Sequence, residues 1–285
     1  MICFTGTNPV RQVNCCRFSE IITVEIMKKS AKKNSASYRQ RSYRAIIGAE
    51  GLRKSEVLVR ETDLQILASK DVKERATHLV LQYRAQLENY LTRRPAFLTS
   101  LVPQPFDPLA PPIAKAMLQA AQDTNVGPMA AVAGAVAEFV GSALLDESEE
   151  IIVENGGDIF MSLQRDSVVA VFAGESPLSY RLGIKISSNR MPLGICTSSG
   201  TVGHSLSFGS SDSVTVLAPS TVLADAAATR LGNELKDDND LNFTLAVAES
   251  LPGISGVLVI MGEKLGAWGE IELVRLSNPT KNLKQ

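Results

Sequence analysis

Hydrophobic positions recur at helical spacing in the first half of the chain. Between residues 71 and 95 one face of a predicted helix carries Ala76, Leu79, Tyr83, Leu87 and Leu91. A second helix is predicted to begin at Pro111 and Pro112 and to end before Gly127, because proline favours the first turn and glycine follows helix ends. Residues 55–69 alternate instead, which predicts two short strands around the sequence ETD.

Small residues define a third predicted helix, over residues 129–145. Ala130, Gly134, Ala137 and Gly141 repeat at a spacing that lets another backbone approach closely. Such a helix is either buried at the centre of the protein or forms the wall of a cofactor cleft, and both can hold together. A fourth helix is predicted at 221–232.

The second half of the chain is richer in strands. They are predicted at 150–154, 157–163, 167–173, 182–187, 213–218, 256–262 and 269–275. Strands in pairs, with helices grouped between them, favour an α+β fold over regular βαβ winding. Residues 1–40 include a basic, Ser/Lys-rich stretch and are expected to be disordered or wrongly assigned to the chain, which leaves 41–280 as a single domain.

Composition excludes several classes of function. The 285 residues carry a formal net charge of −1 and only 5% aromatic residues, so no nucleic-acid partner is expected. No stretch reaches the apolar length of a membrane span, and no signal peptide is recognised, so a cytoplasmic location without membrane contact is expected. The two histidines, His78 and His204, are too few for a multi-histidine zinc site. His78 is expected near the surface.

Two polar stretches could bind a ligand. In ENGGDIF, Gly156 and Gly157 allow positive φ and Asp158 can accept hydrogen bonds, although a plain hairpin turn explains the same residues. The stretch 196–212, CTSSGTVGHSLSFGSSD, offers bare amides and hydroxyls to a phosphate and contains His204. A linker has a similar composition. His204 is the candidate for proton transfer in this half of the chain.

The 221–232 helix carries two isolated oxygens. Ser220 or Thr221 is a plausible N-cap, and Gly232 is placed to end the helix. Asp225 lies too deep to cap this helix, and Thr229 lies one turn further on the same side. Oxygen ligands of this kind suit magnesium. The alternative is a buried structural carboxylate, with Thr229 bonding back to its own helix.

The order of these features carries a resemblance. The phrases DPLAPPI, VGPMAAVAGAVAEFVG, IVENGGDIF, CTSSGTVGHSLSFG and LGAWGE, together with the Asp225–Thr229 helix, resemble the ApbE-type FAD:protein FMN transferases. More closely, residues 38–276 resemble a small bacterial and archaeal branch of that superfamily. The resemblance implies a T-fold-like α+β architecture of mixed and antiparallel sheets packed against a few central helices. By analogy with other T-folds, a homodimer is expected.

The resemblance also implies a reaction. FAD and Mg²⁺ bind together, and FMN passes to a Ser or Thr hydroxyl of an acceptor protein with release of AMP. Asp225 and Thr229 match the metal-binding helix, and Gly134 matches a glycine of the cofactor site. The match of the remaining positions assigns cofactor-binding roles to Gly156, Gly157, Asp158, Ser199, Gly200 and Thr201, and catalytic roles to His204 and Asp225.

Two departures from the family pattern leave alternatives open. Ala133 stands where the family has a lysine before Gly134, and HSLSFG replaces a DPxTG-like loop after His204. Glu138 aligns with the family's acidic residue in the same helix. The chain could therefore be a non-catalytic flavin or nucleotide-binding protein, or a diphosphatase that uses water as the acceptor. No flavinylation site that would make the chain its own acceptor is found.

Overall fold

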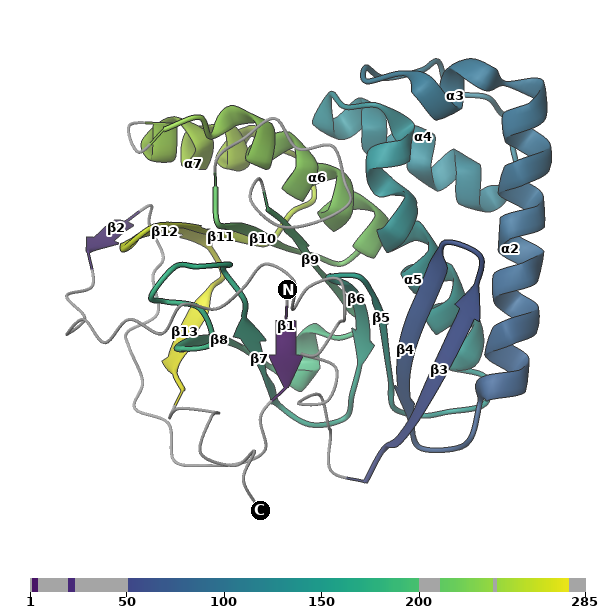
Figure 1. The fold of residues 1–285 in the computed structure, drawn as a ribbon, viewed down its shortest axis with the longest axis horizontal. Helices are drawn as coiled ribbons and strands as arrows, with labels where there is room; N and C mark the ends of the chain where they lie inside the picture. The colour runs from purple at the N-terminus through teal and green to yellow at the C-terminus, as the bar shows by residue number, and fades with distance from the viewer. Residues whose placement is uncertain (1, 5–19, 24–50, 200–210, 238–239, 277–285) are drawn as a thin grey trace.

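Two antiparallel sheets and the helices beside them make up the fold (Figure 1). The computed structural model describes residues 2–4, 20–23, 51–199, 211–237 and 240–276. Within these residues the large sheet has nine strands in the order β2-β12-β11-β10-β9-β6-β5-β4-β3, and the small sheet has the order β1-β7-β8-β13. The strands are β1 (Ile2–Phe4), β2 (Glu20–Thr23), β3 (Arg53–Val59), β4 (Thr62–Ala68), β5 (Ile151–Asn155), β6 (Asp158–Ser162), β7 (Ser167–Val171), β8 (Leu182–Ile186), β9 (Leu193–Ser198), β10 (Ser213–Ala218), β11 (Gly256–Met261), β12 (Lys264–Gly269) and β13 (Glu272–Arg275).

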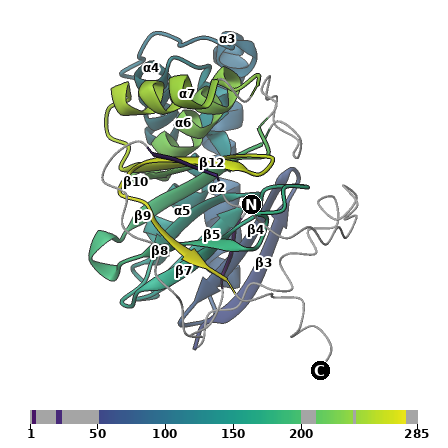
Figure 2. The same cartoon turned by 90° about the vertical axis from the view of Figure 1, so that its left-hand side faces the viewer.

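The helices lie on one face of the large sheet and the small sheet lies on the other (Figures 1 and 2). Helices α6 and α7 cover the strands from β9 to β12, while the long helix α2 runs beside β3. The helices are α2 (Lys73–Arg93), α3 (Pro95–Thr99), α4 (Pro112–Thr124), α5 (Val132–Leu144), α6 (Thr221–Glu234) and α7 (Asp240–Ser250), with a 3-10 turn at Pro128–Ala131 before α5.

Alternation along the central strands explains this layering. On β10, Val214 and Val216 pack with α6 and α7, whereas Leu217 joins the apolar core between the two sheets. On β6, Phe160 packs among the residues of α5 and Ile159 lies in the inter-sheet core. Because both faces of these strands are covered, they are almost continuously apolar. A polar side chain on such a strand therefore needs a specific reason.

The structure confirms the predicted fold class, because helices pack on antiparallel sheets in a mixed α+β arrangement. The 71–95 helix is α2, where Ala76, Leu79 and Leu87 are buried as expected. Strand β10 has the predicted bounds, and the two strands around ETD are β3 and β4. The proposed division at residue 40 is not tested, because residues 24–50 lie outside the described part of the chain.

Several boundaries differ from the predictions. Helix α6 continues to Glu234, so Gly232 does not end it; Gly232 is buried, where a small residue suits close packing. Residues 269–275 belong to two strands, and Trp268 lies within β12, packed toward α6 and α7. Cys196 and Thr197 are part of strand β9 and not of a flexible loop.

The described helices do not include one that is long and apolar enough to cross a membrane by itself. Taken together, α4 and the Pro128–Leu144 segment have the length and composition of a membrane span, but they meet at an angle of 109°. Much of this pair is buried inside the protein, including Ala114, Met117 and Val140.

Candidate functional site

Helices α5 and α6 cross at very short range. A Cβ atom at Gly134 would overlap the carbonyl oxygen of Thr221 and lie 2.7 Å from Cβ of Asp225. Gly134 is therefore the residue that lets the first turn of α5 reach the middle of α6. The small-residue pattern at 129–145 has the close helix contact that was predicted from it.

Asp225 uses this contact to place its carboxylate at the beginning of α5. Its Oδ2 accepts a hydrogen bond of 2.8 Å from the backbone N–H of Gly134. The amide groups of the first helical turn have no partner within the helix, and the helix dipole favours a negative charge there. Asp225 is 9% exposed. The sequence-based expectation that Asp225 lies too deep to cap its own helix is thus explained: its partner is the neighbouring helix.

Burial raises the pKa of Asp225 well above its usual range, and the nearby charge of Asp158 raises it further. The hydrogen bonds from Gly134 and Ala133 act in the opposite direction. Among the described groups that shift this pKa there is no lysine or arginine. The ionised carboxylate is therefore left without a cationic partner in this part of the protein.

Asp158 follows the GGD turn and lies near Asp225. Gly156 and Gly157 have φ values of 73° and 133°, which permit the tight turn between β5 and β6. Burial raises the pKa of the half-buried Asp158 to about 7, with a further contribution from the charge of Glu154. A hydrogen bond with Cys196 and the amide of Thr197 partly offset this shift. The turn thus does more than join two strands: it brings a second carboxylate to the same site.

The backbone around Ala133 is also held in place. Asn155 at the end of β5 donates from Nδ2 to the carbonyl oxygen of Ala133 at 3.1 Å. This links the strand that precedes the GGD turn to the first turn of α5. Position 133, where the resemblance leads us to expect a lysine, thus holds an alanine whose carbonyl oxygen is fixed by Asn155.

The other predicted site residues are only partly described. Thr229 lies half-buried one turn beyond Asp225, and the described contacts include no hydrogen bond from Thr229 back to its own helix. Ser199 follows β9 and is half-buried. Gly200, Thr201 and His204 lie outside the described residues, so their predicted roles stay predictions. The structure thus brings Gly134, Asp158 and Asp225 together.

A magnesium ion fits the donor groups that are present. Asp225 supplies a carboxylate, and Thr229 supplies a hydroxyl on the same side of α6. Magnesium prefers oxygen ligands and keeps several water or phosphate oxygens, so a few protein ligands suffice. The described residues hold no cluster of three or more acidic, His or Cys side chains suited to a metal ion. A site of this kind would therefore need ligand oxygens to be complete.

Sequence analysis missed Gln65 and Glu154, which lie side by side on β4 and β5. Both are almost completely buried, at 1% and 2% exposure. Among the described residues, neither the Nε2 nor the Oε1 atom of Gln65 has a hydrogen-bond partner. The signal was available in the sequence: each is a polar residue that interrupts an otherwise apolar strand, in TDLQILA and IIVEN.

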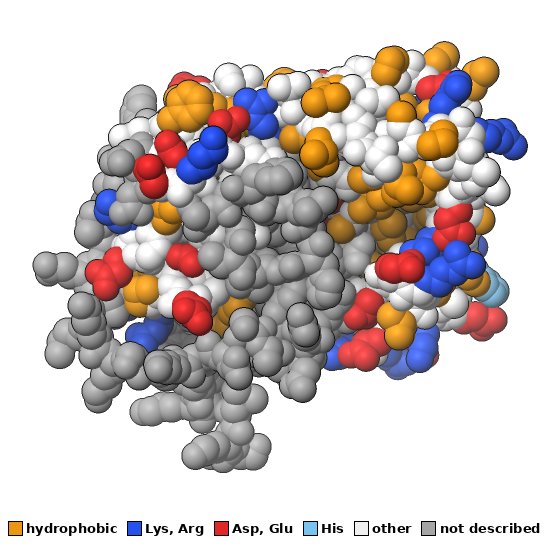
Figure 3. Space-filling view, turned by 45° about the horizontal axis from the view of Figure 1, so that its top comes forward, with side chains coloured by type: hydrophobic (Ala, Val, Ile, Leu, Met, Phe, Trp, Pro, Cys, Tyr) orange, Lys and Arg blue, Asp and Glu red, His pale blue; other side chains and the backbone are white. Residues whose placement is uncertain are grey.

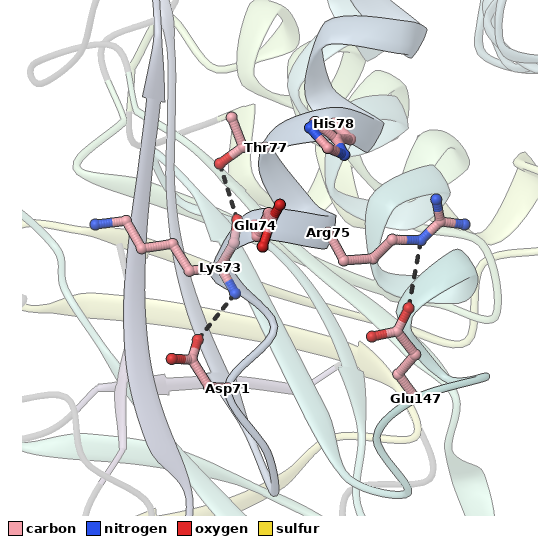
Figure 4. Close-up of a pocket in the computed structure, with 7 residues that line it drawn as sticks. All are labelled: Asp71, Lys73, Glu74, Arg75, Thr77, His78 and Glu147. Atoms are coloured by element: carbon pink, nitrogen blue, oxygen red, sulfur yellow. Dashed lines mark hydrogen bonds and ion pairs between the residues drawn. The ribbon is translucent and has the colours of Figure 1, made fainter.

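A depression of about 800 Å³ lies at the beginning of α2, far along the chain from Asp225 (Figure 4). His78 lines it with charged side chains such as Arg75 and Glu147, whose Nε and Oε1 atoms lie 3.4 Å apart. His78 is exposed, as expected. Because its charged side chains already form an ion pair with each other in solvent, this depression is a weak candidate for a ligand site.

The comparisons with known proteins agree with this fold. A family model described as "AbpE bacteria" matches residues 44–256. A UPF0280 protein of Methanococcus aeolicus is 42% identical over 222 residues, which is 76% of this chain and 90% of the relative. A UPF0280 protein of Methanocaldococcus jannaschii is 38% identical over 229 residues, covering 78% of this chain and 93% of the relative. The crystal structure of apo flavinyl transferase ApbE from Pseudomonas stutzeri superposes with a TM-score of 0.51 at 16% identity, covering 76% and 93% of the two chains.

Proposed function

The chain belongs to the family described as AbpE bacteria, and on that premise we propose that it is an FAD-binding, magnesium-dependent flavin transferase. In this proposal the protein cleaves FAD, passes FMN to a Ser or Thr hydroxyl of an acceptor protein and releases AMP. The fold is that of a flavinyl transferase, and the reaction is carried over from that likeness.

The observation that carries the proposal is the Asp225 carboxylate at the start of α5. It is buried, bonded to the Gly134 amide and close to a second carboxylate, and the described residues give it no positive partner. If this acid were purely structural, an amide or an apolar residue in its place would make the folded protein more stable, because burying an unpaired charge costs free energy. A cation bound with the ligand would compensate the charge.

The proposal assigns a role to each of these residues. Asp225 and Thr229 would hold the magnesium ion, and Asn155 would keep the α5 turn in place through the Ala133 carbonyl. When bound, magnesium supplies charge neutralisation at the diphosphate and at the departing AMP. The acceptor oxygen attacks the phosphorus atom of the FMN half, the bond to the AMP oxygen breaks, and His204 takes the hydroxyl proton. The part played by His204 rests on the sequence alone.

A second candidate function is flavin binding without transfer to a protein. Ala133 in place of the family's lysine favours it, since that position offers no charged side chain to the diphosphate. In the same site, water instead of a hydroxyl would make the protein an FAD diphosphatase. The three activities differ in their products, so one assay separates them.

The test is incubation of the purified full chain with FAD and Mg²⁺, with and without a candidate acceptor protein, followed by chromatography of AMP, FMN and protein-bound flavin. Transfer gives AMP and protein-bound flavin in equal amounts. Diphosphatase activity gives AMP and free FMN. Intact FAD that remains bound indicates the binding function.

Asp225→Asn and Glu138→Gln are matched variants for this assay, because both neutralise a carboxylate in the α5–α6 pair. We expect Asp225→Asn to remove magnesium-dependent turnover and Glu138→Gln to retain it. If the wild type releases no AMP with any acceptor or with water, the catalytic proposal is wrong. If it binds no flavin at all, both candidate functions are wrong.

A further inference from the structure

The face of the large sheet opposite Asp225 carries a second set of polar groups, of which Gln65, Glu154 and Thr215 are buried and Thr197 is half-buried. On β4 and β5, Gln65 lies directly beside Glu154. On β9 and β10, Thr197 lies directly beside Thr215, and their hydroxyl oxygens are 2.9 Å apart. Alternation along the strands places these side chains toward the small sheet, since Leu67, Ile152, Ile195 and Leu217 of the same strands lie in the inter-sheet core.

An apolar residue and a glycine lie between these two polar pairs. Strand β6 lies between β5 and β9, and it contributes Ile159 on this face, preceded by Gly157 of the GGD turn. A Cβ at Gly157 would have only the Thr197 carbonyl oxygen within 4 Å, at 3.6 Å. Glu154 is also close enough to Asp158 for its charge to act on that carboxyl group. The polar pairs and the Asp225 site therefore flank the same turn, on opposite faces of the sheet.

Gln65 is the unusual member of this set. The side chain is 1% exposed, and within the described part of the chain its amide nitrogen and oxygen both lack a partner. Buried polar atoms are nearly always hydrogen-bonded, and an unsatisfied amide destabilises the folded protein. An amide that is kept in an apolar strand at this cost is explained by a ligand that supplies a hydrogen-bond acceptor and a donor side by side.

We infer that Gln65 recognises the imide edge of a flavin, with Nε2 donating to a ring carbonyl and Oε1 accepting from the adjacent ring N–H. This inference rests on the proposed function. An isoalloxazine has one polar edge and one apolar edge, which matches a polar row that borders the inter-sheet core. Adenine, the other ring of FAD, has no apolar edge of this size. Gln65 is a specificity-determining residue in this arrangement and takes no part in bond cleavage.

The test compares ligands that carry only one end of FAD. Riboflavin supplies the flavin without phosphate or adenine, and ADP with Mg²⁺ supplies the diphosphate and adenine without flavin. The variant is Gln65→Met, which keeps the volume of the side chain and removes its hydrogen bonds. Gln119→Met on the exposed surface of α4 is the matched control, since Gln119 bonds only Asp123 among the described residues.

We expect Gln65→Met to weaken riboflavin binding about tenfold or more, because a site built to bond a polar edge loses both bonds at once. ADP binding should change less than about twofold. The ligand-free variant should melt at a higher temperature than the wild type, because the unsatisfied amide is gone. Gln119→Met should change none of these values.

A modified ligand sharpens the result. Riboflavin methylated at the imide nitrogen lacks the N–H that Oε1 accepts. It should bind the wild type more weakly than riboflavin does, and it should bind Gln65→Met no differently from riboflavin. Gln65→Glu, which keeps the acceptor and loses the donor, gives a second variant if Gln65→Met does not fold, and it should also weaken riboflavin binding.

Three outcomes overturn the inference or its premise. Equal riboflavin affinity in wild type and Gln65→Met overturns the role of Gln65 and leaves the proposed function intact. Weaker ADP binding with unchanged riboflavin binding assigns Gln65 to the adenine end and overturns the flavin assignment. A wild type that binds neither riboflavin nor FAD shows that the proposed function itself fails.

Discussion

Helices α5 and α6 each supply a carboxylate, Glu138 and Asp225, that accepts a hydrogen bond at the start of the other helix. The surroundings of the two acids differ. Glu138 of α5 accepts from the hydroxyl of Ser220 at 2.9 Å and from the Val222 amide at 3.0 Å, in the first turn of α6. Asp225 of α6 accepts from the Gly134 amide in the first turn of α5. Each helix thus has an N-terminal amide that donates to a carboxylate of its neighbour.

The difference lies in what surrounds each acid. Glu138 is half-buried, and Ser220 beside it is the N-cap of α6, with its Oγ accepting from the Leu223 amide. Its contacts are those of a structural cap. Asp225 is more deeply buried, lies near Asp158, and has a strongly raised pKa. The same geometric device therefore caps α6 through Glu138, and at Asp225 it holds the carboxylate to which the proposed function assigns the metal.

The largest expected effect comes from Asp225→Asn. The amide oxygen can still accept from Gly134, so the fold should persist, but the negative charge that attracts a cation is lost. We expect magnesium-dependent FAD turnover to fall on the order of 100-fold or more. The ligand-free protein should melt at the same or a higher temperature at pH 8, because a desolvated charge has been removed. A variant that unfolds would instead favour a structural role for Asp225.

Gly134→Ala should have the largest effect on stability. The added methyl group meets the backbone of Thr221 and the Asp225 side chain, and backbone cannot move aside as a flexible side chain can. We expect the free energy of unfolding to fall by about 3 kcal/mol, as for other overpacked sites. Chemical denaturation measures this value. Ala133→Gly is the control, because it changes the neighbouring position without adding atoms. Gly253→Ala is unsuitable as a control, because Gly253 has a φ of 78°, where alanine is strained for a separate reason. A change below about 0.5 kcal/mol in Gly134→Ala would contradict the close crossing.

Glu138→Gln should affect stability and leave ligand chemistry in place. The variant keeps a hydrogen-bond acceptor and loses its charge at the start of α6, so we expect a loss of about 1 kcal/mol in the free energy of unfolding. Ser220→Ala should cost a similar amount, about 1 kcal/mol, through loss of the cap. Thermal or urea denaturation checks both. A loss of FAD turnover in Glu138→Gln as large as in Asp225→Asn would remove the distinction between the two acids.

The last prediction is a pH dependence of stability. Asp158 has a folded-state pKa of about 7, against about 4 in an unfolded chain. Between these values the unfolded state has lost its proton and the folded state has kept it. The contribution of Asp158 to stability is therefore full below pH about 4 and is lost as the pH rises to about 7. Denaturation of ligand-free protein across this range should show the fall, and Asp158→Asn should reduce it. An unchanged slope in Asp158→Asn would assign the dependence to other groups.

The sequence was sufficient for the local features and not for the long-range ones. The N-cap at Ser220 and the same-side placement of Asp225 and Thr229 follow from helix periodicity and side-chain chemistry, and the structure has the cap as predicted. The partner of Asp225 could not be found in this way, because Gly134 lies 91 residues away in the chain. Only the resemblance to a family placed both in one site.

The errors have identifiable physical causes. Cys196–Ser198 was assigned to a loop because serine, threonine and glycine are typical of linkers, whereas pairing with β6 and β10 holds these residues in a sheet. Helix α7 was missed, although Leu241, Leu245 and Ala248 are buried at helical spacing. Gln65 and Glu154 were overlooked because a single polar residue in an apolar strand carries no periodic signal. Their importance appears only when the sheet brings them together.

One further surface exposes large apolar side chains, over α3 and the segment before α4: Leu98, Leu101, Val102, Phe106 and Leu109. Figure 3 shows hydrophobic side chains gathered on the upper right of the molecule. Asp107 holds this segment in place by accepting from Tyr90 and Leu109. A rigid segment that exposes apolar residues is a typical interaction surface. The expected homodimer and the expected acceptor protein both remain predictions.

The most direct test of the central claim is calorimetric titration of Mg²⁺ into the protein saturated with ADP, for the wild type, Asp225→Asn and Glu138→Gln. If Asp225 holds the metal and Glu138 only caps α6, the wild type and Glu138→Gln bind one equivalent of Mg²⁺ with similar affinity. For Asp225→Asn, the measured heat should then be no larger than the heat of Mg²⁺ binding to ADP in the absence of protein. Equal binding in all three proteins would contradict the account, because the Asp225 carboxylate would then not be a magnesium ligand.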